Sequence, residues 1–269
     1  MTTRLPTYFI SHGGGPWPYM DGPFRRRFDV LERTLAGIPA ELPAPPRAVL
    51  VVTAHWEAPQ FLLSAHPQPP MLYDYGGFPP HTYEVRYPAP GDPALAAQVA
   101  GLLRAGGLHA ALDAERGFDH GSFTTLQPIY PQANVPVVQM SLQQELDPAL
   151  HLHAGRLLAP LRDEGVLILA SGLSFHNLRS FDARGAAASQ AFDNWLREAV
   201  LQPDPSERAA RLMRWAEAPA ARQAHPREDH LLPLMVAAGA AGADGAVLHY
   251  HEDEFFGGLA VSGFRFGGG

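Results

Sequence analysis

The sequence has no cysteine and no lysine, since all 20 basic residues among its 269 are arginine. Without cysteine, the chain cannot form disulfides, thiolate metal sites or a cysteine nucleophile. Without lysine, it cannot form a Schiff base, hold pyridoxal phosphate through a lysine, or carry the lysine of a phosphate-binding P-loop. Any transition-metal site must therefore be built from histidine and carboxylate side chains.

Long hydrophobic runs and an excess of positive charge are also missing. No apolar run approaches the roughly 20 residues of a membrane-spanning helix, and the first residues lack the layout of a signal peptide. We therefore expect a cytoplasmic protein with no membrane partner. The net charge is −7 and the arginines at 25–27 form the only basic cluster, which argues against a nucleic-acid partner.

The composition is typical of a globular protein, with 46% hydrophobic and 17% charged residues. A chain of 269 residues is long enough for one domain with a sizeable core. We predict a single domain over residues 1–269, and the sequence does not indicate an oligomeric state.

Residues 48–57 form the most informative stretch, because an unbroken β-branched apolar run there ends abruptly on polar residues. Such a run predicts a strand that is buried on both faces. Two further strands of this kind are predicted at 7–11 and 166–171. Each leads to a histidine at or just past its carboxyl end, where open α/β sheets bind their ligands: His55, His12 and His176.

Other elements follow from hydrophobic spacing and from proline and glycine positions. Helices are predicted at 24–38, 93–105, 123–130, 148–164, 185–201, 206–218 and 230–241. Further strands are predicted at 61–64, 109–113, 135–141, 245–250 and 259–266. This mixed order predicts an α/β domain whose mostly parallel central sheet is flanked by helices, with the active site at the carboxyl ends of the strands.

The segment 67–92 is too long for an ordinary loop of a compact domain, and loops of this length are usually functional or disordered. Its many aromatic residues argue against disorder. We interpret it as an ordered flank of the active site, and a surface loop with a small core of its own is the alternative.

The chain contains 13 histidines, and metal binding and acid–base catalysis are the two roles that require imidazole. His12 precedes three glycines, where a structural histidine is the simpler alternative to a functional one. His120 lies in a sharp turn before a helix. Pro226 fits the first turn of a helix, which would place His230 one turn in, facing the strand ends, and leave His225 as a cap.

Taken together, several motifs resemble the class III extradiol ring-cleavage dioxygenase superfamily, specifically its 4,5-DOPA dioxygenase extradiol-like branch. They run through most of the chain in the family's order: Ser11-His12-Gly13, Ala54-His55-Trp56, Tyr75-Gly76-Gly77-Phe78-Pro79, Tyr87-Pro88-Ala89-Pro90-Gly91, Gly117-Phe118-Asp119-His120-Gly121, Ser171-Gly172, His176-Asn177-Leu178-Arg179 and Asp229-His230-Leu231-Leu232-Pro233-Leu234. One motif departs from the family, where His-Gly-Ser-Pro is common and this chain has three glycines before Pro16. That departure leaves the substrate open.

The resemblance implies a metal-dependent enzyme that opens the ring of a small aromatic diol with O2. It implies a single metal ion, Fe(II) for activity, bound by His12, His55 and His230, and zinc can replace labile iron in a purified sample. It also implies that His176 is an acid–base group that can count as a further ligand. His120 would be a catalytic residue that orients substrate or oxygen.

The chemistry is consistent with these roles. Triplet dioxygen reacts slowly with closed-shell catechols, so a redox metal with open coordination positions is needed. A catechol proton must also be removed, and an imidazole poised near neutrality suits that task. Aromatic side chains that could form the walls for a flat ring are Trp17, Trp56, Tyr75 and Phe78.

Three alternatives remain at this stage. A zinc-dependent hydrolase could use the same histidines, with a metal-bound water as nucleophile. A serine hydrolase is suggested by the glycines after His12 and by Ser174, but His176 occupies the position where the nucleophile motif needs glycine. A non-enzymatic, metal-binding relative would keep the fold without the chemistry.

Overall fold

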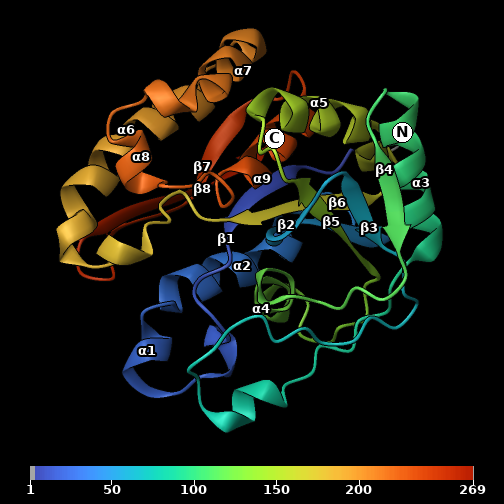
Figure 1. The fold of residues 1–269 in the computed structure, drawn as a ribbon, viewed down its shortest axis with the longest axis horizontal. Coiled ribbons are helices and arrows are strands. Elements are labelled where there is room, and N and C mark those ends of the chain that lie inside the picture. The colour runs from blue at the N-terminus through green and yellow to red at the C-terminus, as the bar shows by residue number, and fades with distance from the viewer. Residues whose placement is uncertain (1–3, 269) are drawn as a thin grey trace.

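One continuous eight-stranded sheet, in the order β4-β3-β5-β2-β6-β1-β8-β7, runs through the computed structural model, which describes residues 4–268 (Figure 1). Its central strands β5, β2, β6 and β1 are parallel, whereas β3, β8 and β7 each pair antiparallel with a neighbour. The prediction of an α/β fold with a mostly parallel sheet is confirmed. The strands are β1 (Thr7–Ser11), β2 (Ala48–Ala58), β3 (Phe61–Ser64), β4 (Ala110–Asp113), β5 (Val137–Gln143), β6 (Val166–Gly172), β7 (Ala246–Phe255) and β8 (Leu259–Phe266).

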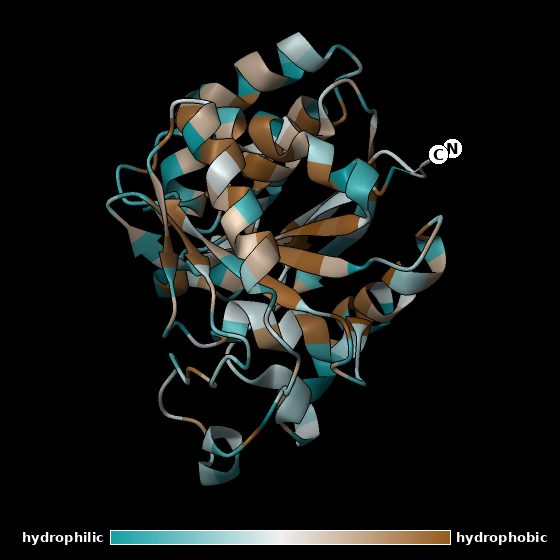
Figure 2. Cartoon of the chain, turned by 90° about the vertical axis from the view of Figure 1, so that its right-hand side faces the viewer, coloured by the Kyte–Doolittle hydropathy of each residue, from teal (hydrophilic) through white to brown (hydrophobic). Residues whose placement is uncertain are grey.

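Helices cover both faces of the sheet, which explains why the central strands are buried and largely apolar. Helices α5 and α9 lie on one side and α2 and α4 on the other (Figure 1). Figure 2 shows the apolar residues concentrated on the central strands between these layers. The helices are α1 (Gly22–Arg26), α2 (Asp29–Glu41), α3 (Pro93–Ala105), α4 (His120–Ile129), α5 (Pro148–Leu158), α6 (Ala186–Val200), α7 (Pro205–Met213), α8 (Ala221–Ala224) and α9 (Leu232–Ala241). Within residues 4–268, no helix is long and apolar enough to cross a membrane.

Several predicted boundaries were wrong. The helix predicted at 24–38 is two helices, α1 and α2, with Phe28 between them. The helix predicted at 148–164 ends at Leu158 and continues as the 3-10 turn Ala159–Glu164. The helix predicted at 206–218 ends at Met213, before the 3-10 turn Trp215–Glu217.

Two boundary errors concern the histidines directly. Helix α9 begins at Leu232, with Pro233 rather than Pro226 in its first turn, so His230 lies in the loop before the helix. Strand β2 does not end at His55 but continues to Ala58, and its pairing with β5 shifts register between Val52 and Glu57. His55 therefore lies on an irregular part of the strand, where a bulge can redirect a side chain.

The segment at 67–92 contains only one short helical turn, Pro80–Tyr83, and is tied to the start of α4. The backbone N–H of Phe118 donates to Pro70 and that of Leu72 donates to Phe118, over 2.8 Å in each case. Tyr87 is fully buried and its hydroxyl donates to the carbonyl of Tyr130. These contacts agree with the interpretation of this segment as a structured flank of the strand ends.

Candidate functional site

The imidazole rings of five histidines from five separate segments meet beyond the carboxyl ends of β1 and β6, beside the irregular part of β2 that carries His55. The rings of His12, His55 and His230 have centroids 4.7 to 5.1 Å apart. His120 lies 3.9 Å from His55, and His176 stacks on His230 with a centroid distance of 3.3 Å. The structure thus brings together every histidine that was predicted to be functional. We call these five residues the histidine cluster.

His12 is held at the end of β1 by backbone bonds. Its N–H donates to the carbonyl of Gly172, and its own carbonyl accepts a 2.8 Å bond from the indole N–H of Trp17. Gly13 has a φ of +75°, and a β-carbon there would collide with the Trp17 ring. The glycine after His12 is therefore needed for the chain to turn around this tryptophan.

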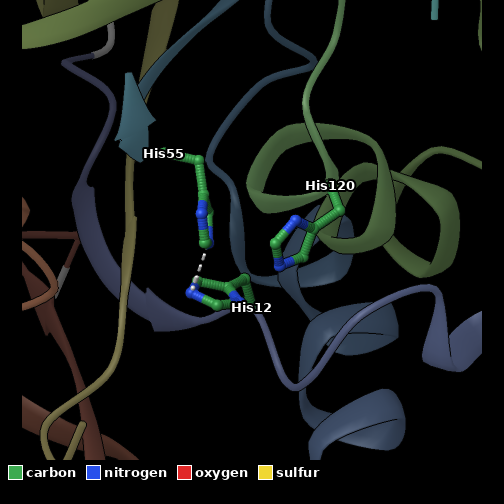
Figure 3. A group of neighbouring side chains, drawn as sticks. All are labelled: His12, His55 and His120. Atoms are coloured by element: carbon green, nitrogen blue, oxygen red, sulfur yellow. Dashed lines mark hydrogen bonds between the residues drawn. The ribbon is translucent and has the colours of Figure 1, made fainter. Parts of the chain in front are cut away.

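His55 faces His12 across the cluster. Their Nε2 atoms lie 3.2 Å apart, and Figure 3 shows the His55 and His120 rings pointing toward His12. The next side chain on the strand, Trp56, lies under the guanidinium of Arg116, which is 4.8 Å from its ring centroid. Because successive side chains of a strand point to opposite faces, Trp56 is directed away from the site.

His120 is the first residue of α4, whose N-cap is the buried residue Asp119. The Asp119 carboxylate accepts bonds from the backbone N–H of Ser122 and the hydroxyl of Thr53. This cap fixes the start of the helix, and with it the position of His120, beside β2.

Asp74 is a site residue that the sequence analysis missed. Its Oδ1 lies 2.9 Å from Nδ1 of His120 and also accepts from the His120 backbone N–H, while its Oδ2 lies 3.6 Å from Nδ1 of His55. Burial raises the pKa of this carboxyl, but its hydrogen bonds to His120 and the charges of His120 and His55 together outweigh burial and leave the pKa below its usual value. Asp74 could have been suspected from the sequence, because it is an acidic residue between Tyr73 and Tyr75 in a segment already interpreted as a flank of the site.

The loop that carries His230 is docked on the end of β6. The N–H of Leu173 donates to the His230 carbonyl over 3.0 Å, and a β-carbon on Gly172 would collide with that carbonyl. His176 is fixed by its own N–H, which donates to Ala224. Asp229 Oδ2 lies 3.1 Å from Nδ1 of His230.

Burial favours the neutral form of four members of the cluster, His12, His55, His176 and His230. It is the main cause that lowers the pKa of His12 and of His230 well below the ordinary value, with repulsion from neighbouring imidazoles as the second cause. Burial also lowers the pKa of His55 to about 3 and lowers that of His176. A neutral imidazole keeps the nitrogen lone pair that a metal ion requires.

The nitrogen atoms of the cluster fit a metal ion. Nδ1 of His12 and Nε2 of His230 are buried without a hydrogen-bond partner. Such unpaired groups are rare in protein interiors and often mark a bound ion or water. Two groups have ligand atoms within 4.8 Å of one another: His12 with His55 and His120, and His176 with Asp229 and His230.

A cavity of about 330 Å³ opens beside the cluster. Tyr75 and Phe78 line it, together with His12, His55, His120 and His176. The prediction that Trp17 and Trp56 form its walls was wrong. Trp17 is fully buried behind Gly13 and supports His12 from the side of the core, and Trp56 is turned toward Arg116.

Comparison with known proteins gives matches along almost the whole chain. Residues 6–261 match the family model of the catalytic LigB subunit of aromatic ring-opening dioxygenase. A 4,5-DOPA dioxygenase extradiol from Portulaca grandiflora is 39% identical over 88% of this chain and 86% of its own. The dioxygenase tasH from Hapsidospora irregularis is 37% identical over 95% of this chain and 85% of its own.

Bacterial proteins match as well. A 4,5-DOPA dioxygenase extradiol from Escherichia coli K12 is 35% identical over 89% of this chain and 86% of its own. The crystal structure of the uncharacterized protein JW3007 from Escherichia coli K12 superposes with a TM-score of 0.80 at 30% identity. That superposition covers 98% of this chain and 100% of the other.

Proposed function

The chain belongs to the LigB family of aromatic ring-opening dioxygenases, and on that premise we propose that it opens a catechol ring with O2 at a single iron(II) ion. The family makes it an enzyme that acts on an aromatic substrate, and it implies a metal cofactor. The finer parts of the proposal are the catechol, the iron and the roles of individual residues. We further propose that residues 1–269 act as one catalytic domain.

The ion would be held by Nε2 or Nδ1 atoms of His12, His55 and His230. The unpaired buried nitrogens of His12 and His230 support this choice. His120 also lies close enough to His12 and His55 to be a ligand, but its Nδ1 is already bonded to Asp74. Three neutral imidazoles suit iron(II) and zinc alike, and zinc would occupy the same site in samples that have lost iron.

When bound, iron(II) supplies the redox chemistry that lets triplet dioxygen react with a catechol. The remaining work falls to side chains beside it. His176 and His120 both line the cavity, and we assign to His176 the removal of a catechol hydroxyl proton. Its depressed pKa keeps this imidazole unprotonated and able to accept at neutral pH.

Asp74 would set the orientation of His120. A carboxylate 2.9 Å from Nδ1 favours the tautomer with the proton on Nδ1, which leaves Nε2 as an acceptor toward the substrate. Tyr75 and Phe78 would pack on the faces of the aromatic ring and keep water out. His120 thus becomes the second catalytic histidine of the proposal.

The observation that carries this proposal is the convergence of five imidazoles, three buried and two half-buried, beside a cavity of the size of a small aromatic molecule, with unpaired nitrogens on His12 and His230. The test is to load the protein anaerobically with Fe(II), add a panel of catechols, and admit oxygen. We expect equimolar consumption of O2 and catechol and a yellow ring-opened product. Zinc-loaded protein and His12→Ala should give neither. Protein that binds iron stoichiometrically but consumes no oxygen with any catechol would refute the proposal.

A further inference from the structure

A continuous series of aromatic contacts leads from the histidine cluster to the mouth of the cavity. Tyr75 lies 5.9 Å from His120, Phe78 lies 5.6 Å from Tyr75, and Phe24 lies 6.0 Å from Phe78, measured between ring centroids. Phe256 then lies 6.3 Å from Phe24, and Phe181 lies 5.2 Å from Phe256. We call Phe24, Phe78, Phe181 and Phe256 the phenyl wall.

The phenyl wall comes from four separate segments: helix α1, the flank at 67–92, the loop after β6 and the β7–β8 turn. All four rings line the cavity, and none is completely buried. Leu178 extends the apolar surface at the rim, where 72% of it is exposed. Apolar surface left open beside a reactive centre marks a place where an apolar group of a ligand can be buried.

Charged groups that could bind a substrate side chain are scarce in this cavity. Its titratable lining residues are four histidines of the cluster, Tyr75 and Asp74, and Asp74 is already bonded to His120. Among the described residues, no arginine contributes to the lining. The guanidinium of Arg27 lies over Phe256, 4.8 Å from its centroid, so this cation stabilises the wall rather than lining the cavity.

We propose that the substrate is a catechol whose ring substituent is uncharged and apolar, such as a short alkyl or aryl group, seated on the phenyl wall. This inference rests on the function proposed above, because the catechol hydroxyls must face the histidines for the substituent to reach the wall. A charged or zwitterionic substituent would lose its hydration there and gain no paired charge. Each additional methylene on the wall should improve binding about three- to fourfold.

The test compares four catechols with similar side chains at the same ring position: 4-propylcatechol, 3-(3,4-dihydroxyphenyl)propionate, dopamine and dihydroxyphenylalanine. With iron-loaded enzyme, we expect kcat/KM for 4-propylcatechol to exceed that for each charged compound by at least about tenfold. Equal or higher kcat/KM for a charged compound would overturn the inference and leave ring-opening activity intact.

A binding measurement separates this inference from the proposed function. Under anaerobic conditions, calorimetry can compare 4-propylphenol with 3-(4-hydroxyphenyl)propionate, neither of which needs to react. Tighter binding of the neutral phenol supports the phenyl wall as the recognition surface even in a protein that opens no ring. Tighter binding of the carboxylate would overturn the inference.

A pair of variants tests the position of the substituent. Leu178→Arg places a cation at the rim and should raise the ratio of kcat/KM for the propionate to that for 4-propylcatechol about tenfold. The control Leu112→Arg makes the same change at a half-exposed leucine on the distant edge strand β4 and should leave the ratio unchanged. An unchanged ratio in Leu178→Arg would show that the substituent does not reach this rim, contrary to the proposal.

Discussion

Gly172 ends β6 at a point where the fold leaves no room for a methyl group. A β-carbon there would collide with the backbone carbonyl of His230, which accepts a bond from Leu173. Gly172→Ala should therefore displace the loop that carries His230. We expect metal affinity to fall about 10- to 100-fold, the effect typical of losing a group that positions a metal ligand. Titration of the apo protein with zinc or anaerobic Fe(II) measures the change.

The matched control is Gly101→Ala, because a β-carbon at Gly101 in α3 meets nothing within 4 Å. This variant should bind metal as the wild type does and gain about 0.5–1 kcal/mol in unfolding free energy, since alanine restricts the unfolded chain and favours a helix. Equal metal affinity in both variants would contradict the argument for Gly172.

Asp74 offers a second prediction for a single residue. Asp74→Asn keeps the shape of the side chain but removes the charge that holds His120 in one tautomer. We expect kcat to fall about 10- to 100-fold with little change in KM, together with a change in the His120 ring 15N shifts. Asp163→Asn is the control, because it alters only an exposed ion pair with Arg4, and such pairs contribute little. A fall in stability without any change in the His120 resonances would argue for a merely structural role.

Individual histidines could be identified from the sequence, whereas their neighbours could not. His12, His55 and His176 stood out because each lies at or just past the end of an apolar run that predicts a buried strand. Trp17 and Trp56 were misplaced because adjacency in sequence does not tell which face a side chain takes. Asp74 was missed because its partner, His120, lies 46 residues away, and only the folded flank joins them.

At the level of elements, the largest errors fell on the segment before α9. Pro226 suggested a helix start, but the turn there is used to bring the His230 carbonyl to β6, and the helix begins only at Leu232. The register shift of β2 near His55 was equally invisible, because an irregular strand has the same apolar pattern as a regular one. Local pattern predicted the type of these elements, and tertiary contacts set their ends.

Helix α5 and strand β5 are joined by a buried histidine outside the site, and this contact predicts a pH effect on stability. His151 Nε2 accepts from the backbone N–H of Gln143 over 3.2 Å, and its Nδ1 lies 2.7 Å from the Asp147 carbonyl. Burial lowers the pKa of His151 to about 4. Between pH 6.5 and 4 this histidine is therefore protonated in the unfolded chain but not in the folded protein. The free energy of unfolding falls as the pH falls.

The free energy of unfolding should fall by roughly 3 kcal/mol by pH 4, because each unit of pKa difference contributes about 1.4 kcal/mol. His151→Asn should be less stable than the wild type at pH 7.5, by about 1–2 kcal/mol for the altered bonds. This difference in unfolding free energy between the two proteins should narrow as the pH approaches 4, because asparagine takes up no proton. Urea unfolding of both proteins from pH 7.5 to 4.5 measures this, and a gap that stays constant with pH would contradict it.

For the whole molecule, the sequence predicted the architecture but not the path of the chain. Buried apolar runs separated by helices indicated a mostly parallel sheet, and this is confirmed. The order of the strands could not be predicted, because β8 joins β1 although most of the chain separates them, and short β3 runs antiparallel to β5. Such pairings depend on tertiary packing between distant segments, which a local sequence pattern does not reveal.

The proposed metal ligands lie far apart in sequence, so a bound ion would connect the beginning of the chain to the loop before α9. An ion that binds only the folded chain stabilises it by about 2.7 kcal/mol when present at 100 times its Kd. For a protein of this size, that corresponds to a rise in Tm of roughly 5–10 °C. Chelation at pH 7.5 should remove this rise, and His12→Ala should not show it. His109→Ala, at an exposed histidine outside the cluster, should retain it.

The same stabilisation should depend on pH in a defined direction. Burial and mutual repulsion hold the pKa values of His12 and His230 well below the ordinary value, so the folded apo protein keeps both rings neutral while the unfolded chain takes up protons below about pH 6.5. The apo protein must therefore lose stability as the pH falls through that range. Bound metal also holds these rings unprotonated, as the folded apo protein already does, so the loss of unfolding free energy should be of similar size with and without metal. Melting curves of the metal-loaded and chelated proteins at pH 7.5 and 5.5 should both shift downward, and a chelated protein that is more stable at pH 5.5 would show that these imidazoles are not buried in a neutral cluster.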